Sequence, residues 1–159
     1  MKHFALTEEN QNLFNELFED TGLHNFMQLK LIGTAKAKEV IHVAKPNDVA
    51  RYVGHLADDV VTIIVYEEAF DRLDEKNKRL LAKDAFNMIR YDDEKDKIAI
   101  GVPQIVVTVT GRQTYDTDLI NAAELGVLSI QQIEDEKREA KEAEKARKAA
   151  EKAAKKQKK

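Results

Sequence analysis

The alternation of hydrophobic and polar positions predicts a set of short elements around one apolar strand. Val60–Tyr66 is almost continuously apolar and rich in β-branched residues, which predicts a strand covered on both faces. Glu67–Leu73 is predicted to form a turn or a short helical piece. A helix is expected over Glu75–Ile89, because Asp74 is a good N-cap and apolar residues then recur at helical spacing. Its expected buried stripe consists of Leu80, Leu81, Ala85, Met88 and Ile89.

The residues before this strand predict one helix and two further strands. A helix is expected over Thr7–Thr21, with Thr7 capping its free amides and Gly22 ending it. Phe26–Ile32 and Glu39–Val43 have the composition of strands. Because the two strands are separated only by a turn rich in small residues, we expect them to pair as a hairpin.

Fewer signals mark the remaining connections. In Val49–Leu56 the apolar residues have the spacing of a short helix. Tyr91–Lys97 is charged and is predicted to form a turn. Two further strands are predicted over Lys97–Ile100 and Gln104–Thr110. A last helix starts at Asp116–Asp118. Its apolar stripe consists of Leu119, Ala122, Ala123, Gly126, Val127, Ile130 and Ile133. Together these elements predict an α+β fold, in which helices pack a small mixed β-sheet and a long charged helix ends the chain.

The apolar stripe stops at Ile133, and this change divides the chain into a domain, residues 1–133, and a tail, residues 134–159. The tail consists almost entirely of Ala, Glu, Lys and Arg, so we expect a solvated helix or a disordered segment. It holds 11 basic and 7 acidic residues, whereas the domain holds 15 basic and 22 acidic residues. The tail is therefore net positive and the domain net negative.

Size and composition narrow the class of protein. A chain of 159 residues without cysteine is long enough to bury a core and contains neither disulfides nor thiolate zinc sites. The longest apolar run is too short to cross a bilayer, and the N-terminal residues lack a signal-peptide pattern. We expect a soluble intracellular protein without membrane contact.

Candidate catalytic and metal-binding residues are few. His3, His24, His42 and His55 are dispersed and form no zinc-binding pair, and Ser129, the only serine, is not in a nucleophile context. The carboxylate groups of Asp58-Asp59, Glu67-Glu68 and Asp92-Asp93-Glu94 could hold a hard cation, but solvated turns are the expected interpretation.

The tail is the exposed feature with binding chemistry. Its end is strongly basic, and docking to nucleic acid or to an acidic protein surface competes with a merely solubilising role. Without aromatic residues, binding to nucleic acid would lack base stacking and sequence specificity. The candidate docking residues are Lys145, Arg147, Lys148, Lys152, Lys155, Lys156, Lys158 and Lys159.

The order of Val60–Tyr66, Glu67–Glu75 and the Leu80-Leu81 pair opening onto a helix resembles the phage metallopeptidase family of small zincin-like proteins. That resemblance implies a zincin-like fold, a bacteriophage source and an HELxH zinc motif on the helix. The motif falls on Lys83 to Asn87, where Lys83 and Asn87 replace the two histidines and Asp84 replaces the general-base glutamate. No histidine follows position 55 to supply a third ligand. The resemblance therefore implies a degenerate member without a cofactor.

Three functions are compatible with these residues. The first is a non-catalytic accessory or structural binding protein, located in the host cytoplasm or on the virion, which docks a phage or host protein through its tail. The second is a hydrolase with an atypical site. A third, a protein that associates with nucleic acid through the tail, uses the same basic residues.

Overall fold

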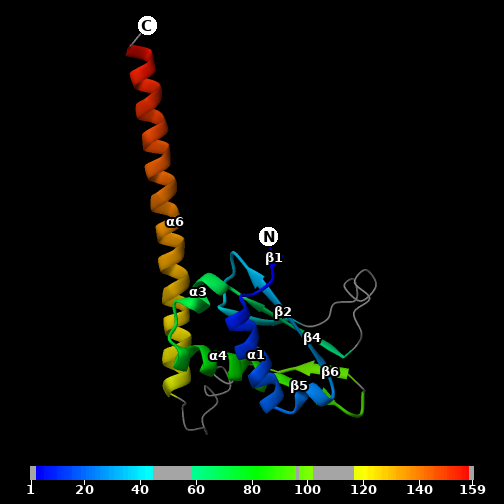
Figure 1. Cartoon of the computed structure of the whole chain (residues 1–159). Helices are drawn as coiled ribbons and strands as arrows, with labels where there is room; N and C mark the ends of the chain where they lie inside the picture. Colours follow the sequence, from blue (N-terminus) through cyan, green and yellow to red (C-terminus); the bar gives the residue numbers. More distant parts are fainter. Residues whose placement is uncertain (1–2, 45–58, 96, 102–116, 158–159) are drawn as a thin grey trace.

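The structure is a computed structural model, which describes residues 3–44, 59–95, 97–101 and 117–157 and excludes the side chains of Lys97 and residues 152–157. In this part of the chain a four-stranded mixed sheet, a two-stranded sheet and four α-helices form an α+β fold (Figure 1). The α+β fold class with a long C-terminal helix, predicted from the sequence, is thus confirmed.

The four-stranded sheet has the order β1-β2-β4-β3. Its strands are β1 (His3–Phe4), β2 (Gln28–Thr34), β3 (Ile41–Ala44) and β4 (Val60–Val65). β2 pairs with β4 in parallel and β3 pairs with β4 in antiparallel orientation. The predicted hairpin between Phe26–Ile32 and Glu39–Val43 is therefore wrong. The corresponding strands, β2 and β3, do not pair with each other, because β4 lies between them and pairs with both.

β4 has the strongest apolar pattern because it is the inner strand between β2 and β3. Val61, Ile63 and Val65 have no exposed surface, and Val60 is also buried. An inner strand with both faces covered needs apolar residues at successive positions rather than alternating ones. The strand predicted from the continuous run Val60–Tyr66 is confirmed, but its second face is only partly covered, because Thr62 and Ile64 are partly exposed.

Two longer helices and one short helix pack beside this sheet. They are α1 (Glu8–Asp20), α3 (Glu67–Asp71) and α4 (Glu75–Asn87), and a 3-10 turn, η1 (Leu23–Asn25), follows α1. Phe14 of α1 lies 5.6 Å from Phe70 of α3 and 6.1 Å from Phe86 of α4, measured between ring centroids. These aromatic contacts join all three helices in one core.

The predicted helix ends are partly confirmed. The carboxylate of Asp74 accepts a hydrogen bond from the Asn77 amide at 2.8 Å, so Asp74 caps α4 as expected. Gly22 follows α1 in the left-handed conformation, with φ 73°. Thr7, however, makes no side-chain cap for α1, because its hydroxyl group donates to Glu67 instead.

α4 buries a different stripe from the predicted one. Lys78, Ala82, Ala85 and Phe86 are buried, whereas Leu80, Leu81 and Met88 are only partly covered. The rotation arises because α4 packs against α6 on one side and α1 on another, so no single apolar face decides its orientation. Ile89 is buried as predicted, but it belongs to a strand rather than to the helix.

A separate antiparallel pair consists of β5 (Ile89–Asp92) and β6 (Lys97–Ile100). The second strand was predicted, but Tyr91 and Asp92 lie in β5 rather than in the expected charged turn. The predicted helix Val49–Leu56 and strand Gln104–Thr110 lie outside the described residues.

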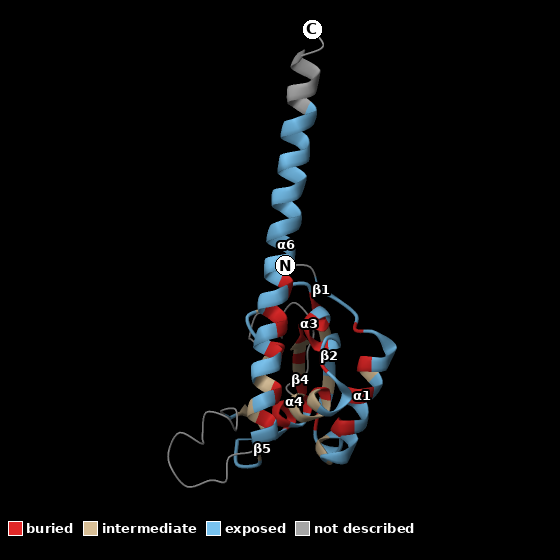
Figure 2. Cartoon of the chain, turned by 90° about the vertical axis from the view of Figure 1, so that its left-hand side faces the viewer, coloured by how far each residue is buried: buried red, intermediate tan, exposed pale blue. Residues whose placement is uncertain are grey.

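The last helix, α6 (Thr117–Gln157), runs from the body of the molecule far beyond it (Figure 1). Leu119, Ala122, Ile130 and Ile133 are buried against the body, as the sequence predicts. Val127 was expected in the same stripe, but its side chain is 52% exposed. Beyond Ile133 every residue whose burial is described is exposed, as Figure 2 shows along the upper part of α6.

Candidate functional site

The three positions that match the degenerate zinc motif do not converge. Lys83 and Asn87 are exposed, whereas Asp84 is buried with 8% of its surface exposed. The charge of Lys83 acts on Glu16 of α1, whose pKa is lowered mainly by a hydrogen bond from Arg79 and to a smaller extent by Lys83. Lys83 and Asp84 therefore face different neighbours of α4.

Asp84 lines a groove of about 390 Å³ between β3, α4 and the first turns of α6. Most of the lining is apolar, with Val40 and Val43 on one side and Leu81 and Met88 on another. Lys83 and Asn87 are not part of this lining, so the groove does not gather the three motif positions. Among the residues that the structure describes, the acidic residues that line the groove are Asp84 and the exposed Glu39.

Potential metal ligands are scattered over the part of the chain that the structure describes. Within it, no group of three His, Cys, Asp or Glu residues has the arrangement needed to hold a metal ion. His3, His24 and His42 are exposed, and His55 lies outside the described residues.

One of the predicted solvated carboxylates is in fact a buried structural group. Glu67 is 7% exposed, and its Oε1 accepts hydrogen bonds from the amide and the hydroxyl group of Thr7 at 2.7 and 2.8 Å and from the Asn10 side chain at 2.9 Å. The carboxylate lies at the start of α1, where a negative charge is favoured by the helix dipole. Glu67 thus fixes α1 against α3, an interaction that sequence spacing alone did not indicate.

Ser129 also has a structural role. It is buried, and its hydroxyl group donates to the carbonyl oxygen of Leu125 one turn earlier in α6, at 2.9 Å. This local hydrogen bond to the preceding turn is common for a serine inside a helix.

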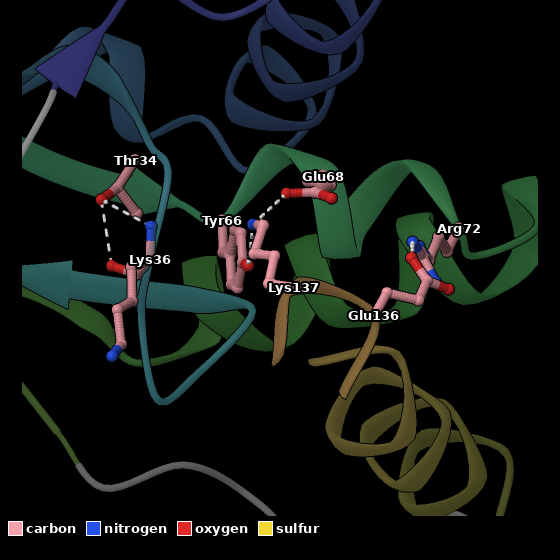
Figure 3. Close-up of polar contacts among 7 residues, drawn as sticks. All are labelled: Thr34, Lys36, Tyr66, Glu68, Arg72, Glu136 and Lys137. Carbon is pink, nitrogen blue, oxygen red and sulfur yellow. Dashed lines mark hydrogen bonds and ion pairs between the residues drawn. The ribbon is translucent and has the colours of Figure 1, made fainter. Parts of the chain in front are cut away.

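Two ion pairs attach the base of the tail to α3 and the turn that follows it. The guanidinium of Arg72 donates to both carboxylate oxygens of Glu136, at 3.0 and 2.7 Å. Lys137 places its ammonium 2.6 Å from Oε2 of Glu68 and 3.3 Å from the hydroxyl oxygen of Tyr66 (Figure 3). We call these two pairs the attachment.

The attachment changes the titration of its members. The hydrogen bond from Arg72 holds the pKa of Glu136 below its usual value, and the hydrogen bond to Glu68 raises the pKa of Lys137. Both shifts favour the charged forms of Glu136 and Lys137. Together with the burial of Ile130 and Ile133, the attachment joins the base of the tail to the body.

The predicted docking residues occupy the free part of α6. Lys145, Arg147 and Lys148 are exposed, and the pairs that they form, Arg147 with Glu151 and Lys148 with Glu144, are local i,i+4 contacts on the helix surface. Such exposed pairs are weak and exchange readily with other anions. Lys152, Lys155 and Lys156 lie on the described helix backbone, whereas Lys158 and Lys159 lie outside the described residues.

Comparison with known proteins adds no relative. No family model, curated protein or solved structure matches the chain. Among the residues that the structure describes, no helix combines the length and the apolar character needed to span a bilayer.

Proposed function

We propose that this protein is a non-catalytic binding protein that docks onto a negatively charged partner through its tail. The observation that carries the proposal is the division of α6 at Ile133. Up to that residue the helix is packed against the body, and from Glu134 onwards each described side chain is exposed. A helix that continues for several turns without burying a face is available for contact with another molecule.

The charge distribution supports an acidic partner. The tail is net positive and residues 1–133 are net negative, with 15 basic and 22 acidic residues. A negatively charged partner is therefore attracted by the tail and repelled by most of the body. Contact is expected to be confined to the tail.

The attachment supports docking by a rigid helix rather than by a loose extension. Glu68 of α3 and Arg72, just after α3, pair with Lys137 and Glu136 in the first turn beyond Ile133. Because less freedom is lost when a preorganised surface binds, a fixed tail strengthens binding relative to a mobile one.

The placement of the motif positions supports a binding role over the hydrolase alternative. Lys83 and Asn87 are exposed outside the groove that Asp84 lines. A zincin-like ancestry, with a bacteriophage source and a location in the host cytoplasm or on the virion, is part of the proposal. It rests on the order of β4, α3 and α4. Metal analysis of the purified protein tests the non-catalytic part, and stoichiometric bound zinc with peptidase activity would contradict it.

Docking through the tail is tested with two full-length variants of equal charge. The tail variant carries Lys145→Gln, Arg147→Gln and Lys148→Gln. The body variant carries Lys30→Gln, Lys83→Gln and Arg90→Gln, three exposed positions outside the tail. Binding to poly-L-glutamate, heparin and a 30-base-pair DNA duplex is measured by fluorescence anisotropy in low salt.

The proposal predicts that the tail variant binds at least one of these polyanions about tenfold more weakly than the wild type. With three cations removed, fewer counterions are released from the polyanion on binding. The body variant should bind as tightly as the wild type or slightly more weakly. Equal losses in both variants, or no binding to any polyanion, would contradict docking through the tail.

A further inference from the structure

Six lysines of the tail lie on one side of α6. At 3.6 residues per turn, positions separated by three or four residues lie on the same side of a helix. Lys141, Lys145 and Lys148 follow this spacing and are exposed. The same spacing continues along the sequence at Lys152, Lys155 and Lys156. We call these six residues the lysine stripe.

The acidic residues of the tail flank the lysine stripe. From the same helical spacing, Glu139 and Glu142 fall about a quarter turn or more from the centre of the stripe, whereas Glu144 and Glu151 lie along its other flank. Glu144 pairs locally with Lys148 of the stripe. The net positive charge is therefore concentrated along a line of about 20 Å between Lys141 and Lys155, at 1.5 Å of rise per residue.

The residues beside the lysine stripe exclude most kinds of partner. A helix that docks into a protein groove needs large apolar anchors at helical spacing, and one that lies on a membrane needs Trp, Phe or Leu. Between Glu134 and Lys159 the only apolar residue type is alanine. Neither mode has the side chains that it requires.

A nucleic-acid backbone needs only a row of cations. Phosphates recur along each strand at regular intervals, and lysine contacts them without any apolar or aromatic neighbour. We infer that the lysine stripe binds the phosphate backbone of nucleic acid, without sequence specificity. This inference rests on the proposed docking through the tail and names the partner of that surface.

The test moves the lysines without changing the composition. A relocated full-length variant exchanges three lysines with nearby alanines, through Lys141→Ala with Ala143→Lys, Lys145→Ala with Ala146→Lys, and Lys148→Ala with Ala150→Lys. Length, net charge and residue content stay the same, and the three lysines move to the opposite side of the helix. Circular dichroism checks that both proteins have the same helix content.

Binding to two 30-base-pair duplexes of unrelated sequence is measured by anisotropy between 50 and 200 mM salt. The wild type is expected to bind both duplexes equally and to lose about 10³-fold in affinity over this range, as for roughly six phosphate contacts. The relocated variant should bind at least about tenfold more weakly at 50 mM salt. The slope of its log affinity against log salt concentration should correspond to about three fewer phosphate contacts.

Two results would overturn the inference and leave docking through the tail intact. One is binding of the relocated variant as tight as that of the wild type, which would mean that net charge alone matters. The other is tail-dependent binding to poly-L-glutamate without binding to either duplex. Loss of tail dependence for every polyanion would overturn the proposed function as well.

Discussion

Lys137 of α6 reaches Glu68 of α3, with its ammonium nitrogen 2.6 Å from the carboxylate oxygen Oε2. The same ammonium lies 5.6 Å from the ring centroid of Tyr66, a fully buried side chain at the end of β4. Lys137 is thus the last residue of α6 that contacts both the surface and the core of the body. The tail emerges directly beyond it.

The attachment should depend on pH through Glu136. Its pKa is lowered from the ordinary value of 4.5 by the hydrogen bond from Arg72. A carboxyl group whose pKa is lower in the folded state stabilises that state above its unfolded pKa, and this contribution is lost as the pH falls through the folded pKa. Glu136→Gln should therefore lower Tm slightly at pH 7, and the difference from the wild type should shrink as the pH falls below 4.5 towards 3. Thermal melts at both pH values check this, with Glu139→Gln, on the exposed tail, as the control.

The neighbouring residues Glu67 and Glu68 should differ strongly in their effect on stability. Glu67→Ala leaves Thr7 and Asn10 without their buried acceptor, so we expect a loss of about 2–3 kcal/mol in the free energy of unfolding. Glu68→Ala removes only a half-exposed ion pair and should cost less than about 1 kcal/mol. Urea unfolding measures both. Similar losses for the two variants would show that Glu67 does not anchor α1.

Gly126 should be required by the close approach of α6 to Val40, the residue before β3. A Cβ atom at this position would lie 2.8 Å from Cγ2 of Val40, which is itself buried. Helix propensity favours alanine by about 1 kcal/mol, whereas overpacking costs about 1–3 kcal/mol. We expect Gly126→Ala to destabilise the protein by about 1 kcal/mol.

The effect should change sign when the obstacle is removed. In a Val40→Ala background the added Cβ keeps only ordinary contacts, at 3.7 Å from Leu81 Cδ1 and from the Cβ of residue 40. Gly126→Ala should therefore stabilise that variant by up to about 1 kcal/mol. An equal effect of Gly126→Ala in both backgrounds would mean that the close approach to Val40 does not govern this helix.

The tail beyond the attachment should contribute little to stability. Residues 141–151 are exposed, and a protein ending at Ala140 keeps both ion pairs of the attachment. Its Tm should lie within about 2 °C of that of the full chain, because no apolar surface is lost. A larger decrease in Tm would indicate that the tail packs against the body.

Local pattern predicted the elements of this fold better than it predicted their partners. The continuous apolar run predicted the strand β4. The helical spacing of Leu13, Phe14, Leu17 and Phe18 in the sequence likewise matches the core face of α1, where all four side chains are buried. The hairpin between β2 and β3 was wrong because strands close in sequence do not always pair. β4 lies between them instead and offers both strands a partner that is apolar except for Thr62.

Of the candidate site, only the charged and exposed residues of the tail could be predicted from composition. The charged residues of the tail and their exposure follow from the end of the apolar stripe at Ile133. The roles of Glu67 and Lys137 do not follow from the sequence, since their partners lie about 60 or more residues away and only the fold brings them together. Thr7 illustrates the same point, because its hydroxyl group serves Glu67 rather than its own helix.

The most direct test of the account locates the contact surface on the intact protein. Uniformly labelled full-length protein is titrated with a 30-base-pair DNA duplex, and backbone amide shifts are followed by NMR. The account predicts that the largest changes occur in residues 141–159, with little change along β3 and α4. Changes centred on the groove residues Val40, Val43 and Met88, or an absence of changes in the tail, would contradict it.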